Sequence, residues 1–306
     1  MMNLRSIIQK VLCLLALFAV LTLCSSCSGY GITELVKTTE FDYINIDQLK
    51  SDFDADDINL LQSDNGKIVL KEYMNKDKRE YYAKSKIKNN ELEITEGSRP
   101  LSTAFDSYIE IYLPKDYKGG INLHSTSGEV RCVNNNSEFR SLHIDTTSGI
   151  INAQNINALR SKLSSTSGEI KMTDSKSSVI EIENTSGNST LDNVQGEIKF
   201  QGKSGNIVGI NLIGGGSFNM SADGKIKLDF RAVNNNISAY TKNESLSVTL
   251  PRSLNFSFSA ETKDGAVRTN FDDVLNTEGN KKTGIIGSSP DINIRLESKN
   301  GDVIVR

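Results

Sequence analysis

The sequence predicts an all-β protein, most simply a right-handed parallel β-helix with roughly 19–20 residues per coil and less regular N-terminal coils. The first observation is a recurring phrase, Ser-Thr-Ser-Gly or a close variant, whose glycines lie 18 to 21 residues apart. These glycines, ending in a weaker echo, are Gly128, Gly149, Gly168, Gly187, Gly205 and Gly224. The second observation is that no stretch beyond residue 26 shows helical periodicity, while apolar residues alternate around each phrase.

Alternation on both sides of the glycine predicts two half-buried strands per coil with a tight turn between them. The positions two residues after the glycine are Val130, Ile151, Ile170, Ser189, Ile207 and Ile226. The positions five residues before it are Leu123, Ile144, Leu163, Ile182 and Phe200. We expect both sets to point into the interior of the stack. Cys132 falls in a similar inward column and is expected to be an inert core residue.

The six glycines are expected to form the structural turn of each coil. A sharp turn that recurs in every coil usually needs a residue at positive φ, which glycine adopts without steric cost. The Ser and Thr residues beside it are expected to bond their own backbone and that of the neighbouring coil.

The same frame continues in degraded form toward both ends. Coils are expected around Glu244, Gly265 and Gly301, and upstream at Asn65-Gly66 and at Leu92-Glu93-Ile94. The charged segment 71–90 interrupts the pattern and is expected to form a surface hairpin or a cap, because the open ends of a solenoid need covering.

The first 26 residues predict a secretion signal rather than a part of the fold. Arg5 and Lys10 precede the apolar run 11–23, which is too short to span a bilayer comfortably. The following Leu-Cys-Ser-Ser-Cys resembles a bacterial lipoprotein signal that would make Cys27 the lipidated first residue; ordinary cleavage after Ser26 is the alternative. The predicted organisation is a signal at 1–26, an anchor and linker at 27–34, and a β-helix repeat domain at 35–306.

Composition narrows the possible partners. The chain has 35 basic and 38 acidic residues and no basic block, so nucleic acid and anionic lipid surfaces are poor candidates. Cys13 and Cys24 would leave with the signal and Cys27 would carry the lipid. Because Cys132 alone would remain, a disulfide framework is excluded.

Three stretches together resemble the putative-adhesin family of bacterial envelope β-strand-repeat proteins. They are the repeated Thr-Ser-Gly-Glu-Ile/Val, the lead-in Tyr-Ile-Glu-Ile-Tyr-Leu-Pro-Lys at 108–115, and the ending Ser-Lys-Asn-Gly-Asp-Val-Ile-Val at 298–305. The resemblance covers approximately residues 35–306. It implies an extracytoplasmic β-helical domain of otherwise unknown function, with a surface or adhesion role and no assigned catalytic residues.

Two motifs that carry chemistry in other proteins do not fit here. Gly202-Lys203-Ser204 resembles the end of a phosphate-binding loop, but five residues rather than four separate Gly196 from Gly202, and no helix follows. His124 and His143 are the only histidines, and they should occupy different columns on adjacent coils without a cluster of metal ligands. They also lack the orienting partner that a Ser-His-Asp hydrolase needs.

A polysaccharide-cleaving β-helix would gather carboxylates in a groove. In this sequence they are scattered. Glu129 and Glu169 follow their glycines two coils apart, and Asp145 and Glu183 share a column with Ser164 between them. This spread is typical of solvated faces.

Two further sets of residues are candidates for binding. The residues before the glycines form a Thr column (Thr126, Thr147, Thr166, Thr185) and a Ser column (Ser127, Ser148, Ser167, Ser186, Ser204). A flat array of this kind can bind an ordered ligand, although turn chemistry beside glycine is the simpler interpretation. The chain has no Trp, so stacking on sugars would depend on tyrosines, of which the candidates are Tyr73, Tyr81, Tyr82, Tyr108 and Tyr112.

The sequence therefore predicts a non-catalytic, adhesin-like envelope protein without cofactor or metal. It would be held at the outer membrane or at the outer face of the cytoplasmic membrane by its lipid, and would present a binding surface to an unknown protein or polysaccharide. Two alternatives stay open: a partner of an envelope-stress or signalling regulator, and a polysaccharide-active enzyme.

Overall fold

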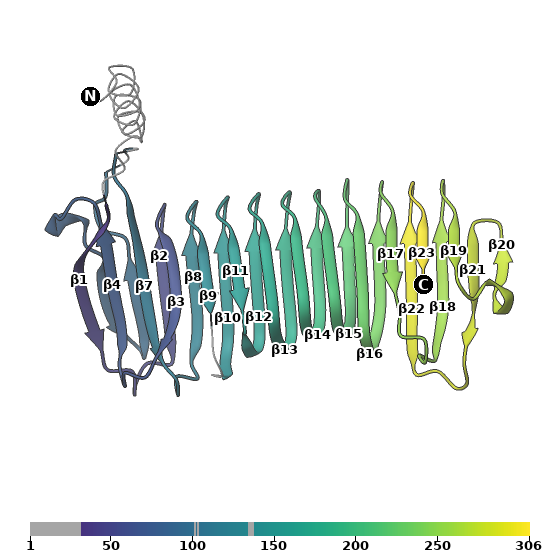
Figure 1. The fold of residues 1–306 in the computed structure, drawn as a ribbon, viewed down its shortest axis with the longest axis horizontal. Coiled ribbons are helices and arrows are strands. Elements are labelled where there is room, and N and C mark those ends of the chain that lie inside the picture. Colours follow the sequence, from purple (N-terminus) through teal and green to yellow (C-terminus); the bar gives the residue numbers. More distant parts are fainter. Residues whose placement is uncertain (1–31, 101, 103, 134–137) are drawn as a thin grey trace, which may run out of the picture.

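The computed structural model describes residues 32–306 apart from 101, 103 and 134–137. These residues form an elongated stack of flat coils that stand side by side, and this stack is called the rack (Figure 1). The predicted parallel β-helix is confirmed, because strands of successive coils pair in parallel. Apart from strands, the described residues contain two three-residue 3₁₀ helices, neither of them long or apolar enough to cross a membrane. The signal and Cys27 lie outside the described residues.

The central coils come from one continuous segment of the chain. Their strands are β8 (Gly120–Ser125), β9 (Val130–Val133), β10 (Glu138–Thr146), β11 (Ile151–Gln154), β12 (Asn157–Ser165), β13 (Ile170–Asn184), β14 (Ser189–Gly202), β15 (Ile207–Met220), β16 (Ile226–Thr241) and β17 (Leu246–Thr249). Ile151 pairs with Val130 on one side and with Ile170 on the other, so the register follows the spacing of the glycines.

Each coil contributes one strand to each of two faces. The pre-turn face consists of the strands that run into the Ser/Thr-Gly turn: β8, β10, β12 and the C-terminal halves of β13 to β16. The post-turn face consists of the strands that leave it: β9, β11, the N-terminal halves of β13 to β16, and β17.

A second corner returns the chain from the post-turn face to the pre-turn face of the next coil. Its αL residues are Asn155, Asp174, Asn193 and Asn211, with φ between 50° and 55°. Asn and Asp adopt this conformation more readily than other residues with a side chain. This ladder was not among the predicted features, although an Asn or Asp recurs every 18 or 19 residues in the sequence.

The coils at the N-terminal end are not stacked in chain order. Strands β2 (Gln48–Phe53) and β3 (Asp57–Ser63) lie between β6 (Glu91–Thr95) and β7 (Ser107–Pro114) on one side and β8 and β9 on the other. The expectation of a coil at Asn65-Gly66 is wrong, because these residues lead into β4 (Ile68–Met74), which runs antiparallel to β7. Leu92 and Ile94 do belong to a coil, as expected.

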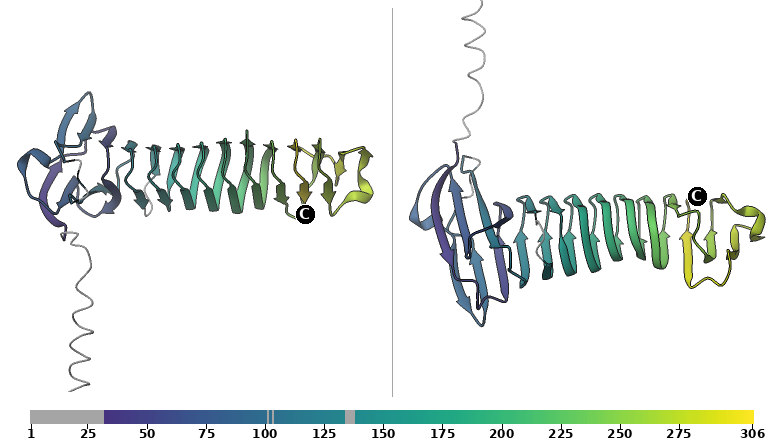
Figure 2. Two further views of the ribbon diagram at one scale, coloured as in Figure 1. Left: turned by 90° about the horizontal axis from the view of Figure 1, so that it is seen from above. Right: turned by 60° about the horizontal axis from the view of Figure 1, so that its bottom comes forward.

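Antiparallel strands close this end. β1 (Glu34–Phe41) pairs with β4, and β5 (Lys84–Lys88) pairs with β6, with the 3₁₀ helix η1 (Arg79–Tyr81) between β4 and β5. Segment 71–90 is thus part of an end cap, as expected. All residues of β5 are exposed, and lysines on such an outer strand oppose edge-to-edge aggregation. Figure 2 shows that this end is broader than the rest of the rack.

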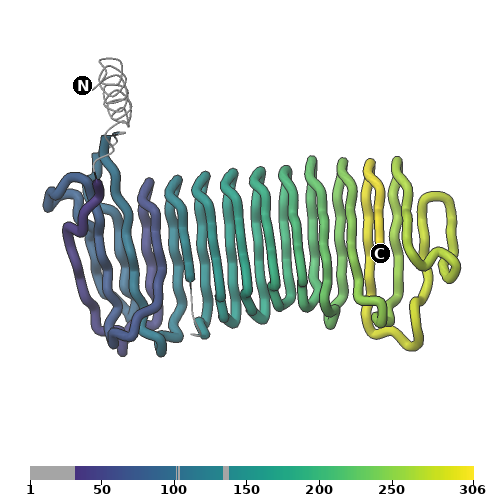
Figure 3. Tube along the Cα trace, viewed as in Figure 1, coloured from purple at the N-terminus to yellow at the C-terminus, as the bar shows by residue number. Residues whose placement is uncertain are grey.

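The coils at the C-terminal end are likewise not stacked in chain order. β22 (Ile292–Ser298) and β23 (Val303–Val305) lie between β16 and β17 on one side and β18 (Phe256–Thr262) and β19 (Val267–Thr269) on the other. Figure 3 shows the yellow last coil between earlier, greener ones. β21 (Lys281–Ile286) then pairs antiparallel with β18, and β20 (Asn276–Glu278) pairs with β21; the 3₁₀ helix η2 (Asp272–Val274) precedes β20.

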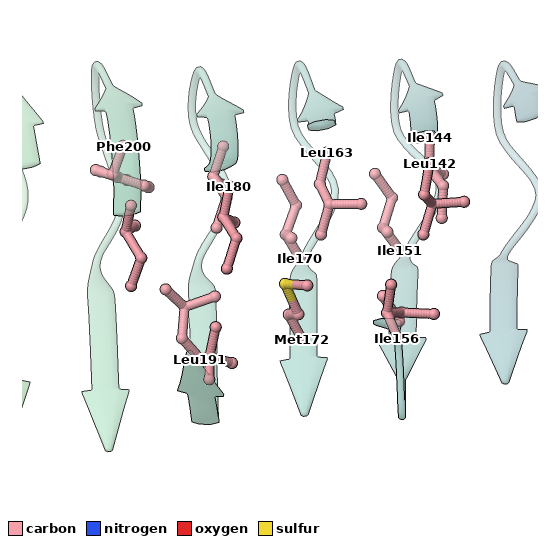
Figure 4. Packing of buried hydrophobic residues seen from close by; sticks show 14 of the residues in the cluster. Leu142, Ile144, Ile151, Ile156, Leu163, Ile170, Met172, Ile180, Leu191 and Phe200 are labelled. Atoms are coloured by element: carbon pink, nitrogen blue, oxygen red, sulfur yellow. The ribbon is translucent and has the colours of Figure 1, made fainter. Parts of the chain in front are cut away.

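The core is the space between the two faces (Figure 4). The two predicted inward columns are buried throughout their length, each residue being at most 1% exposed. Ser189 is the only polar member of these columns, and its hydroxyl lies 3.2 Å from Asn184 Nδ2. Cys132 is buried as expected, and burial raises the pKa of its thiol to about 12.

Candidate functional site

In the first four phrases the first residue, Ser125, Thr146, Ser165 or Asn184, is buried and organises the turn. Ser125 Oγ, Ser165 Oγ and Asn184 Oδ1 accept hydrogen bonds of 2.8–3.0 Å from the N–H of the glycine three residues later. Thr146 instead donates to the carbonyl of its own glycine, at 2.9 Å. Such a side chain satisfies a backbone group that the tight turn would otherwise bury without a partner.

The two residues that follow in each of these phrases are exposed, but only the Ser column forms side-chain hydrogen bonds within the fold. Ser127, Ser148, Ser167 and Ser186 donate to backbone carbonyls of the preceding coil, at 2.9–3.4 Å. The hydroxyls of the Thr column make no hydrogen bond within the described residues. The Ser column thus serves turn chemistry, and the Thr column faces solvent.

The turn glycines are needed because neighbouring coils approach closely. A Cβ at Gly149, Gly168, Gly187 or Gly224 would lie 1.8–2.0 Å from the carbonyl oxygen of the preceding turn glycine, and one at Gly128 would lie 2.0 Å from Asp56 O. Of the six, Gly205 alone has a positive φ, at 99°. The expectation of positive φ is therefore wrong for the other five, where crowding by backbone excludes a side chain.

Gly202-Lys203-Ser204 lies at the end of β14 and in the following turn, with strand β15 rather than a helix after it. The Ser204 N–H donates to Thr185 O at 2.8 Å, as in the other turns. The segment has the geometry of a coil corner.

The two histidines do lie in different columns of adjacent strands, as predicted. The expectation that neither histidine has an orienting partner is wrong for His124, whose Nδ1 lies 3.0 Å from Asp145 Oδ2. Ser164 pairs with Asp145 on its far side from His124, so Asp145 separates the Ser164 hydroxyl from the imidazole. A hydrolytic triad needs the imidazole in the middle. Burial lowers the pKa of His143.

The other acids that sequence analysis weighed are engaged in exposed ion pairs. Glu129 pairs with Arg131 at 2.9 Å, Glu169 with Lys171 at 3.1 Å, and Glu183 with Lys162 at 3.0 Å. The described residues contain no group of three or more His, Cys, Asp and Glu side chains that could hold a metal.

Three of the five candidate tyrosines come together on the post-turn face at the N-terminal end. The rings of Tyr73 and Tyr108 stack at 4.4 Å, and the hydroxyls of Tyr73 and Tyr112 donate to Glu110 Oε2 at 2.9 Å. Burial and this carboxylate raise the pKa of both donors to about 12, so they stay protonated. Tyr81 is buried and Tyr82 bonds Asp77, so these two lie outside the cluster.

A buried charge cluster, also missed by sequence analysis, fixes the N-terminal end. Arg99 contacts the carboxylates of Asp56 and Glu72, and all three side chains are at most 3% exposed. Burial raises the pKa of Glu72, while the Ala83 N–H at 2.6 Å opposes the rise. Asp56 occupies the turn-glycine position of its coil, and the neighbouring coil has a long connection, 96–106, instead of a tight turn. The carboxylate therefore has room to meet Arg99, and the cluster is structural.

The pre-turn face has a hollow toward its C-terminal end, where the side chains of its two outward-facing columns change in length and charge. One column reads His143, Lys162, Glu181, Lys199, Ser217, Ser238, Arg295, and the other reads Asp145, Ser164, Glu183, Gln201, Asn219, Tyr240, Glu297. Where short side chains replace long charged ones, a hollow of about 660 Å³ opens.

This polar groove is lined mainly by Gln201, Ser217, Asn219, Ser238, Tyr240, Arg295 and Glu297. Smaller hollows of about 340 and 410 Å³ extend it on either side, one sharing Ser217 and Ser238 and the other Tyr240 and Glu297. Asn219 Nδ2 donates to Gln201 at 3.3 Å, whereas Asn219 Oδ1 is buried and accepts no hydrogen bond within the described residues. A buried acceptor without a donor is costly, and Asn219 is one of the residues that line the groove.

A match to a protein family agrees with this architecture. The family described as Toastrack DUF4097 matches residues 46–306. Among solved structures, a putative adhesin from Bacteroides fragilis is 14% identical, with 88% of this chain and 96% of that chain covered and a TM-score of 0.49. A putative adhesin from Parabacteroides distasonis is 12% identical, with coverage of 90% and 98% and a TM-score of 0.44. A putative cell adhesion protein from Clostridium sporogenes is 14% identical, with coverage of 89% and 98% and a TM-score of 0.28. No curated protein matches the chain.

Proposed function

The chain belongs to the Toastrack DUF4097 family, and we propose that it is a non-catalytic, adhesin-like protein of the bacterial cell envelope that binds a polysaccharide in its polar groove. It would be exported by residues 1–26 and anchored by a lipid on Cys27. The observation that carries this proposal is the unpartnered Asn219 Oδ1 in a groove of hydroxyl and amide side chains.

The chemistry of the groove fits a hydroxyl-rich ligand. Serine hydroxyls and the Asn219 and Gln201 amides offer both donors and acceptors, and Tyr240 offers an apolar ring with a polar tip. With its extensions the groove crosses several strands, as a binding site for a chain molecule requires. The ion-paired, dispersed carboxylates support binding over cleavage.

The position of the groove suits a surface role. Cys27 precedes the first described residue by five positions, which span at most about 18 Å, and that residue lies at the N-terminal end of the rack. Nine strand-to-strand steps of about 4.8 Å then carry β22 roughly 43 Å from β6. An anchored protein would hold its groove well away from the bilayer.

Affinity electrophoresis of the purified chain against a panel of neutral and anionic polysaccharides tests the proposal. Asn219→Ala and Tyr240→Ala should weaken the retardation that a bound polysaccharide causes, and Ser217→Arg should abolish it by filling the groove. Ser247→Arg, at a half-buried serine on the post-turn face, is the matched control and should bind normally. Retardation that survives Ser217→Arg, or no retardation by any polysaccharide, would exclude this groove as a polysaccharide site and favour a protein ligand. New chain ends would show an enzyme instead.

A further inference from the structure

The C-terminal end of the rack is closed by a cap of aromatic rings rather than by another full coil. On the pre-turn face β21 continues beyond β18, whereas β19 pairs only with β23 on the post-turn face. Phe271 lies in the connection after β19 and meets Phe256 and Phe258 edge to face, with ring centroids 5.6 and 5.2 Å apart. A cap built on a few large rings fills the coil interior less evenly than the stacked columns do.

Beside this cap lies a pocket of about 390 Å³. Leu250, Leu254, Phe256, Phe271 and Ile286 form its apolar wall. Phe256 and Leu250 are only 3% and 8% exposed, so the wall belongs to the core rather than to a surface loop. The volume lies within the range of small-molecule sites. An engineered cavity of about 150 Å³ takes benzene, so this pocket has room for an apolar body of roughly a dozen carbons.

The charged residues that line the pocket are both basic. Arg252 and Arg306 belong to the lining, and no Asp or Glu does. Neither arginine side chain makes an ion pair or hydrogen bond within the described residues, although most of the rack's other arginines do. The backbone of Arg306 is held in place by hydrogen bonds with Val248 and Leu250, both 2.9–3.0 Å long. An apolar wall beside two unpaired guanidinium groups matches a ligand with an apolar body and an anionic head.

We propose that this C-terminal pocket binds an amphipathic carboxylate, such as a fatty acid of medium chain length. The hydrocarbon chain lies against Phe256 and Phe271, and the carboxylate meets Arg252 and Arg306. The site is separate from the polar groove and does not depend on the function proposed for it.

Isothermal titration of the purified chain with decanoate and, in parallel, with decanol tests the site. Decanoate should bind more tightly than decanol. Arg252→Gln should weaken decanoate binding by about fivefold, the upper value for an exposed ion pair, and leave decanol binding unchanged. Leu254→Trp should abolish binding of both by filling the pocket. Arg160→Gln, at an exposed arginine on the pre-turn face, is the matched control and should change neither.

The proposal is overturned if the wild-type chain does not bind decanoate at millimolar concentration. It is also overturned if Arg252→Gln and Arg160→Gln behave alike, or if decanoate still binds fully to Leu254→Trp. Urea unfolding of each variant identifies any loss that arises from misfolding. If Leu254→Trp proves to be misfolded, Arg252→Gln tests the proposal, because the Arg252 side chain is exposed and makes no ion pair or hydrogen bond within the described residues.

Discussion

Replacing Gly168 with Ala tests why glycine recurs at the first corner of the coil. The added Cβ would lie 1.9 Å from the carbonyl oxygen of Gly149, a backbone atom that cannot rotate away, and φ at this position is not positive. Three other glycines separate the cost of crowding the added Cβ from the cost of a positive φ. Gly66 has neither, Gly279 has only a positive φ of 60°, and Gly205 has both.

The expected magnitudes follow from these contacts. Overpacking costs about 1–3 kcal/mol, and a forced shift of the turn also strains hydrogen bonds worth about 1 kcal/mol each. Two such bonds are at risk, from Gly168 N–H to Ser165 Oγ and from Ser167 N–H to Thr147 O, at 2.8 and 2.9 Å. We expect Gly168→Ala to lower the free energy of unfolding by about 3 kcal/mol.

The companion variants should rank by mechanism. Gly66→Ala should be within about 0.5 kcal/mol of the wild type, because the new methyl group meets nothing. Gly279→Ala should cost about 1 kcal/mol through φ alone. Gly205→Ala should cost at least as much as Gly168→Ala, since both costs apply.

Urea unfolding followed by far-ultraviolet circular dichroism measures the series. Amide hydrogen exchange at Thr185 and Ser186, in the next coil, shows whether the damage spreads, because a solenoid can open in sections. If Gly168→Ala is as stable as Gly66→Ala, the crowding argument fails. Gly279→Ala tests positive φ alone, and Gly168→Ala tests crowding alone. If Gly279→Ala destabilises the protein more than Gly168→Ala does, φ rather than coil spacing selects glycine.

Four further outcomes are expected. Arg99→Ala should cost about 3–5 kcal/mol in urea unfolding, because two buried carboxylates lose their cation; a loss under 1 kcal/mol would contradict this. Asn184→Ala should cost about 2–3 kcal/mol through its lost bonds to turn backbone, whereas exposed Thr185→Ala should stay within about 0.5 kcal/mol. The folded-state pKa of His143 is below its unfolded value, so its contribution to stability is present above about pH 6.5 and is lost as pH falls through the folded pKa; melting curves of His143→Gln should show a weaker acid dependence over that interval. Cys132 should resist iodoacetamide at pH 8 until urea unfolds the chain, and rapid alkylation of the folded protein would contradict its burial.

Much of the fold could be predicted because neighbouring coils repeat one pattern. The glycine spacing correctly aligned Val130, Ile151 and Ile170 across three strands, and the same alignment placed Asp145, Ser164 and Glu183 in one column. Stacking requires residues one period apart to lie beside each other, so position in the repeat determines burial. The prediction that the turn glycines need a positive φ was wrong for five of the six. A turn considered alone suggests a positive φ, whereas the crowding that requires glycine comes from the neighbouring coil.

The stacking order at the ends could not be predicted in this way. Every coil presents similar strand edges, so the pattern around Gly301 is compatible with any place in the stack. Only the tertiary structure places β22 against β16, which brings Arg295 and Glu297 beside Tyr240 and completes the polar groove. The same kind of insertion brings Asp56 to Arg99 across 43 residues of sequence.

The sequence by itself determined the β-helix, its period and its inward columns, because these depend on residues one coil apart. The tertiary structure decided the two interleaved ends, the buried charge cluster, the polar groove and the C-terminal pocket. These features depend on which coil lies against which and on where a short side chain leaves space beside a long one. Pairing between equivalent strand edges leaves that choice open until the whole chain has packed.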